Sequence, residues 1–134
     1  MSYENALAPW RPHLLSTLRI VAALEILQHG TSKLFGFPAY PAFANVQINS
    51  LMGVSGIIEL IGGLLFLVGL FTRPVAFILC GFTAAAYFMV HASKSFFPLV
   101  NGGELAVLYC FVFLYFVAAG PGPWSLDAAR RGRD

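Results

Sequence analysis

Four long apolar segments follow one another along this 134-residue chain, and they restrict its fold more than any other feature. A helix needs about 20 mostly apolar residues to cross a membrane. Segments that meet this condition lie at about 13–35, 51–71, 74–93 and 103–120. Prolines and glycines, which are typical of turns and helix ends, separate them. The pattern predicts an all-α integral membrane four-helix bundle that forms one domain over residues 1–134.

The composition supports a membrane protein and excludes some other classes. Only 10% of the residues are charged, whereas a soluble domain carries roughly 25%. The formal net charge is +2, and no basic run alternates with aromatic residues in the way that nucleic-acid binding requires. We therefore expect membrane lipid, and no nucleic acid, among the partners of the chain.

The two cysteines, Cys80 and Cys110, are too few and too far apart in sequence for a disulfide framework or a zinc motif. If the third and fourth segments each cross a membrane core of about 30 Å, their residue numbers place Cys80 and Cys110 ~12 Å apart along the membrane normal. That gap exceeds the ~7 Å between Cα atoms that a disulfide can bridge. We expect both cysteines to be small buried residues that do not contact each other.

The basic residues predict the orientation. With four spans, both termini and the turn at 72–74 lie on one side of the membrane. Six arginines belong to that side, namely Arg11, Arg19, Arg73, Arg130, Arg131 and Arg133, against Lys33 and Lys94 on the other. Because basic residues are in excess on the cytoplasmic side of membrane proteins, both termini are predicted to be cytoplasmic.

The first apolar segment carries a stripe of ionisable residues. Measured from Arg19, the side chains of Glu25, His29 and Lys33 fall at about 240°, 280° and 320° around the helix. Such groups cost several kcal/mol each in lipid unless they are paired or hydrated, so the stripe should face the bundle interior. Alternatively, Glu25 pairs with His29 within the helix, and Lys33 reaches outward to the surface.

A second acid is expected at the depth of Glu25. Glu59 and Glu25 each lie ~18 Å from the inner ends of their helices. Glycines that would allow a partner helix to come close surround Glu59: Gly56, Gly62 and Gly63. If the two carboxyl groups meet, one of them should hold a proton. If they do not, each meets a different base, such as Arg19 or a histidine, and both interpretations stay open.

The third and fourth segments add further candidates. His91 shares a helix face with Tyr87 and lies at the depth of His29, ~25 Å against ~24 Å. Two histidines could ligate a metal or a haem, but neighbouring carboxylates are their commoner partners, so we expect neither. Glu104 follows Asn101 at the start of the last segment, where a carboxylate also complements a helix N-terminus.

Together these residues predict an outward-facing polar pocket within the membrane. Its main candidates are Glu25, His29, Lys33, Glu59, His91 and Glu104, and its secondary ones are Arg19, Tyr87 and Asn101. Which of them, if any, are catalytic stays open.

Five motifs resemble those of the DoxX family in the same order. They are HGTSKLFGFP (29–38), GIIELIGGLLFLVGLFTRPVA (56–76), AAAYFMVH (84–91), NGGELAVLY (101–109) and GPGPWSLD (120–127). The resemblance implies a small, multi-pass, four-helix protein of the bacterial inner membrane. Members of that family are often described as oxidoreductases, and relatives include the small subunit of a thiosulfate:quinone oxidoreductase. Other relatives are cargo receptors without redox chemistry.

Two functional hypotheses follow. In the first, the chain is a component of a quinone-linked oxidoreductase, in which the pocket handles protons while a quinone or a redox partner protein carries electrons. In the second, it is a binding or scaffolding protein that captures a small molecule, a lipid or a partner segment. A homo-oligomer is compatible with either hypothesis.

Overall fold

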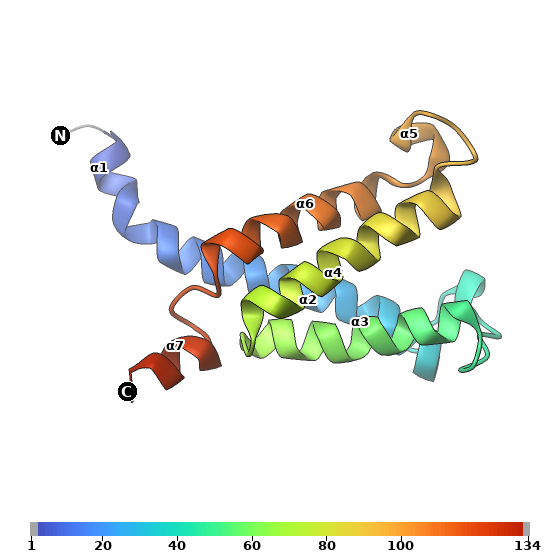
Figure 1. Cartoon of the computed structure of the whole chain (residues 1–134), viewed down its shortest axis with the longest axis horizontal. Coiled ribbons are helices and arrows are strands. Elements are labelled where there is room, and N and C mark those ends of the chain that lie inside the picture. The colour runs from blue at the N-terminus through green and yellow to red at the C-terminus, as the bar shows by residue number, and fades with distance from the viewer. Residues whose placement is uncertain (1–2, 133–134) are drawn as a thin grey trace. The chain divides into compact units, whose positions relative to one another are not determined.

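The computed structural model describes residues 3–132, which form helices and no strand (Figure 1). This confirms the all-α prediction. The elements are α1 (Tyr3–Leu7), η1 (Ala8–Trp10), α2 (Arg11–Phe35), η2 (Pro41–Phe43), α3 (Leu51–Val68), α4 (Thr72–Ala86), η3 (Tyr87–His91), α5 (Pro98–Asn101), α6 (Glu104–Ala119) and α7 (Leu126–Arg131). The chain divides into two compact units, Met1–Phe71 with Pro121–Asp134 and Thr72–Gly120. The prediction of one domain over the whole chain stays a prediction.

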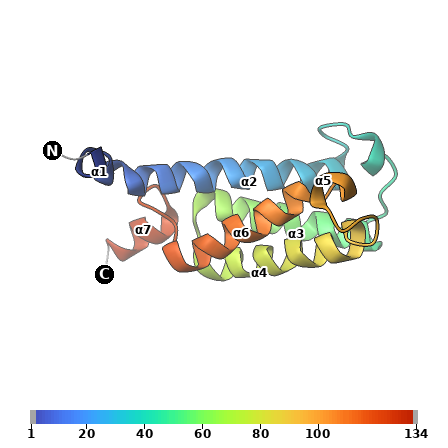
Figure 2. The same cartoon turned by 90° about the horizontal axis from the view of Figure 1, so that it is seen from above.

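The first unit is built on the antiparallel pair α2 and α3, which lie side by side (Figure 2). Their backbones come very close at Gly30. A Cβ atom on Gly30 would lie 2.7 Å from the backbone nitrogen of Leu60 and 2.9 Å from the carbonyl oxygen of Gly56. One on Gly63 would lie 2.7 Å from the Leu27 side chain. The glycines near Glu59 thus allow the close helix approach that the sequence predicts.

Arg19 attaches the C-terminal segment to this pair. Only 1% of the residue is exposed, and its guanidinium donates to the carbonyl oxygens of Pro121 and Trp124. It also donates to the carbonyl of Leu67 in the last turn of α3, over 3.4 Å. Arginine near a helix C-terminus satisfies carbonyls that have no partner within the helix. Arg19, a secondary candidate for the polar pocket, therefore has a structural role: it links the end of α3 to the segment after α6.

The second unit is built on α4 and α6, which are antiparallel and packed together. α4 continues into the π turn η3, where Ala92 N–H donates to the Tyr87 carbonyl over 2.9 Å. Three pairs of facing residues, seven residues apart on each helix, set the register: Arg73 with Val117, Cys80 with Cys110, and Tyr87 with Gly103. Seven residues make about two helical turns, so the three contacts lie along one seam.

The prediction for the cysteines is therefore wrong. The Sγ atoms of Cys80 and Cys110 lie 3.7 Å apart. The expected gap of ~12 Å between the cysteines assumed that each helix crosses the full membrane core and that the ends of the two helices lie at the same level. α6 has only 16 residues, or about 24 Å, and its register against α4 follows from contacts such as Arg73 with Val117.

Within residues 3–132, two helical segments are long and apolar enough to cross a membrane, Leu51–Val68 and Thr72–His91. The second predicted span ends three residues early because Gly69 adopts a left-handed φ of 68° and ends α3. α6 is apolar but shorter than these segments, and α2 has 25 residues with several charges among them. These two segments are consistent with a membrane protein, and the four-helix membrane bundle stays a prediction.

Candidate functional site

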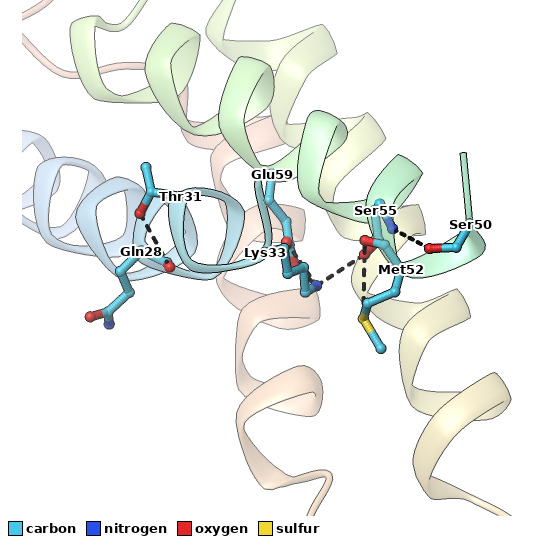
Figure 3. Close-up of polar contacts among 8 residues, drawn as sticks. Gln28, Thr31, Lys33, Ser50, Met52, Ser55 and Glu59 are labelled. Carbon is cyan, nitrogen blue, oxygen red and sulfur yellow. Dashed lines mark hydrogen bonds and ion pairs between the residues drawn. The ribbon is translucent and has the colours of Figure 1, made fainter. Parts of the chain in front are cut away.

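A buried ion pair joins α2 and α3. Lys33 Nζ lies 2.8 Å from Oε1 and 2.8 Å from Oε2 of Glu59, and only 7% and 6% of the two side chains are exposed (Figure 3). Lys33 stands in the last turn of α2, and Glu59 stands in the middle of α3. The close approach of the helices near Gly30 and Gly56 brings the two side chains together. A charged pair thus lies buried between α2 and α3.

Ser55 completes the surroundings of the ammonium. Lys33 Nζ donates to Ser55 Oγ over 3.0 Å, and Ser55 Oγ donates to the Met52 carbonyl over 2.6 Å (Figure 3). An ammonium has three N–H donors, and its contacts to two carboxylate oxygens and one hydroxyl match that number. Ser55 stands one turn before Glu59 on the same helix face.

An aromatic ring from the loop between α2 and α3 covers one side of the pair. The Phe43 ring centroid lies 5.0 Å from Lys33 Nζ, within the range of a cation–π contact. His29, one turn before Lys33, has its ring centroid 6.3 Å from that of Phe43. His29 is half-buried, so its side chain is more accessible than those of Lys33 and Glu59.

Glu25 lies outside this arrangement. Its side chain is exposed, and its Oε2 accepts a hydrogen bond of 2.7 Å from Gln28. The equal depth expected for Glu25 and Glu59 is wrong, because the register of the helices places Glu59 opposite residues 30–33 of α2. That level is at least five residues, or roughly 7 Å, from Glu25. Glu59 meets a base, as in the second interpretation, and that base is Lys33, whereas the hydrogen-bond partner of Glu25 is the neutral amide of Gln28.

In the second unit, Asn101 organises a separate polar cluster. Its amide Nδ2 donates to Tyr87 Oη over 3.1 Å and to the Ser95 carbonyl over 3.0 Å, and its Oδ1 accepts from Gly103 N–H over 2.8 Å. Its backbone carbonyl lies 3.1 Å from His91 Nδ1. A carbonyl only accepts, so His91 carries a proton on Nδ1 when this bond forms. Asn101 is buried, and it contacts both Tyr87 and His91 of η3.

The remaining candidates divide between the two units. Glu104 is exposed and is the first residue of α6, the position in which a carboxylate complements the helix dipole. In the first unit Lys33 contacts Glu59, and His29 and Lys33 both lie against Phe43. In the second unit Asn101 contacts Tyr87 and His91. The prediction of a single pocket that includes Glu25, His91 and Glu104 stays a prediction. Among residues 3–132, no group of three or more His, Cys, Asp or Glu side chains could hold a metal ion.

The model of one protein family, DoxX, matches residues 14–92, which include Lys33, Glu59 and His91. The chain belongs to the DoxX family. A Haemophilus influenzae protein described as uncharacterized is 45% identical to this DoxX protein over 127 residues, which cover 92% of this chain and 95% of the relative. No solved structure matches the chain. The family supports a membrane protein, in agreement with the two long apolar helical segments.

Sequence reasoning missed three features of this DoxX protein. Ser55 could have been found, because it stands four residues before Glu59 on one helix face. The contact between Cys80 and Cys110 depends on the register of α4 against α6. The position of Phe43 depends on the path of the loop after α2, which holds the cis peptide Phe37–Pro38.

Proposed function

We propose that this DoxX protein is a multi-pass protein of the bacterial inner membrane, with both termini in the cytoplasm, and a component of a quinone-linked oxidoreductase. The buried pair of Lys33 and Glu59 is its proton-handling centre. The observation that carries this proposal is the burial of both charges between α2 and α3.

The burial matters because taking charges out of water is costly. Replacing a buried ion pair by apolar side chains is often neutral or stabilising, so such a pair is weak evidence for a stabilising role. An ionisable residue within a membrane is by default a candidate functional group. Lys33 and Glu59 are therefore best explained by chemistry that needs a mobile proton in an apolar place.

A quinone fits the surroundings of the pair. Its reduction takes two electrons and two protons, and its head group is a planar ring with two carbonyl acceptors. Ligand sites of this kind are mostly apolar, with a few polar groups that fix orientation. The Phe43 ring offers an aromatic face beside Lys33, and a quinone carbonyl would take the place of one of the present acceptors of Lys33 Nζ. A redox partner protein supplies or removes the electrons in this proposal.

Thermal unfolding in detergent tests the proposal, with decylubiquinone as the probe. A bound ligand raises the unfolding temperature, and saturation at 100 times Kd adds about 2.7 kcal/mol. We expect the quinone to raise the unfolding temperature of the wild type and of Glu25→Gln, a matched change at an exposed carboxyl. Glu59→Gln and Ser55→Ala should lose that increase, whatever their own unfolding temperatures. An equal increase in all four proteins would exclude this site.

A second candidate is a binding or scaffolding function without redox chemistry. It is favoured by the complete set of partners around Lys33, whose contacts match its three donors. In that case decylubiquinone leaves the unfolding temperature of the wild type unchanged. Native mass spectrometry then detects a lipid or peptide bound to the wild type and lost from Glu59→Gln.

A further inference from the structure

The two cysteines of this chain meet although 30 residues separate them. Cys80 on α4 and Cys110 on α6 have their Sγ atoms 3.7 Å apart, and both residues are half-buried. They are the only cysteines in the sequence, so a disulfide within one chain can join only these two. Neither residue has a part in the cluster around Lys33 and Glu59.

The register that brings the cysteines together is held on both sides of them. Seven residues before Cys80, the Arg73 guanidinium donates to the Val117 carbonyl over 2.7 Å and also to the Ala118 carbonyl. Seven residues after Cys80, Tyr87 accepts a bond of 3.1 Å from Asn101. The thiols therefore face each other through the geometry of the helix pair.

The remaining distance is short. An S–S bond measures about 2.05 Å, against the present 3.7 Å between the sulfurs. Rotation about the two Cα–Cβ bonds is the movement that would bring the sulfur atoms closer.

We propose that Cys80 and Cys110 form a reversible dithiol–disulfide couple that exchanges electrons with a membrane quinone. In the forward step both S–H bonds break and one S–S bond forms. The two electrons and two protons pass to the two carbonyl oxygens of the quinone, which leaves as quinol. The reverse step reduces the disulfide and regenerates the quinone. The choice of oxidant rests on the proposed function, and the couple gives the chain an electron carrier of its own.

Thiol counting on the purified full chain tests this inference. The reduced protein is treated with diamide, a thiol oxidant that needs no quinone site, or with decylubiquinone. It is then denatured and labelled with a maleimide. We expect both oxidants to lower the count of labelled thiols from two per chain to none, without a dimer on a non-reducing gel. The quinone arm should release one quinol per chain. Cys80→Ser and Cys110→Ser should each keep one labelled thiol and form no quinol.

The two arms distinguish the ways in which the inference can fail. If both thiols stay labelled after diamide, the pair cannot close and the inference is overturned, whatever the quinone does to the unfolding temperature. If diamide closes the pair but the quinone does not, the cysteines are no quinone-linked couple. If the quinone nevertheless raises the unfolding temperature in the thermal test of the proposed function, that function stands without the cysteines.

Discussion

Lys33 Nζ lies 2.8 Å from each carboxylate oxygen of Glu59, in a salt bridge that joins α2 to α3 where both side chains are almost fully buried. The same pair holds two helices in register and places a proton donor next to a proton acceptor. Changes at either residue therefore affect both stability and function, and the variants below separate the two effects.

Glu59→Gln should destabilise the protein strongly. The amide has nearly the shape of the carboxylate, so packing is kept while Lys33 loses its counter-charge. Breaking a buried pair in this way costs about 3–5 kcal/mol. The free energy of unfolding in detergent measures the loss.

The matched control is the double variant Lys33→Met with Glu59→Leu, which removes both charges. Replacement of a buried pair by apolar residues is often neutral or stabilising, so its free energy of unfolding should return to the wild-type value or exceed it. A double variant as unstable as Glu59→Gln would show that lost packing, and not the unpaired charge, causes the effect.

Gly30→Ala should separate α2 from α3. The new Cβ would meet backbone atoms of Leu60 and Gly56 at 2.7 and 2.9 Å, and backbone cannot rotate away as a side chain can. We expect a loss of about 1–3 kcal/mol in unfolding free energy, the usual cost of overpacking. Gly81→Ala on α4 is the control, since open space surrounds it and alanine favours a helix by roughly 0.5–1 kcal/mol. Equal effects of the two variants would contradict the close approach at Gly30.

Arg19→Met should release the segment that follows α6. The guanidinium donates to Pro121 and Trp124, and buried carbonyls without a donor cost about 1–3 kcal/mol each. Hydrogen exchange at the Asp127 amide, which donates to the Gly69 carbonyl over 2.9 Å, should become faster. Arg11→Met, at an exposed arginine, should leave that exchange unchanged. Slow exchange in both variants would show that Arg19 does not hold the segment.

A reporter at the C-terminus tests the predicted orientation. Six arginines on the side of the termini, against two lysines on the other, favour a cytoplasmic C-terminus. Green fluorescent protein fused there should fluoresce, whereas alkaline phosphatase at the same position should be inactive. An active phosphatase would reverse the orientation.

Local residue patterns were enough to predict the four long helices, but not the short helices α1, α5 and α7. Apolar length predicted the helix positions, since each helix satisfies its backbone hydrogen bonds within its own segment. Glycine and proline predicted where the last long helix ends, at Gly120, because these residues set the backbone angles locally, whereas the earlier end of α3 at Gly69 was not predicted. The glycines beside Glu59 predicted a close partner helix for the same local reason, namely the absence of a side chain.

Tertiary structure decided which side chains meet. Counting along helices from assumed flush ends paired Glu59 with Glu25 in depth and separated Cys80 from Cys110. The structure instead pairs Glu59 with Lys33 and Cys80 with Cys110. A helix advances about 1.5 Å per residue. A shift of one helix by five residues along its neighbour therefore changes every pair of facing side chains. That shift is determined by contacts across the interface, such as Gly30 against Leu60 and Arg73 with Val117, and no pattern within a single helix contains it.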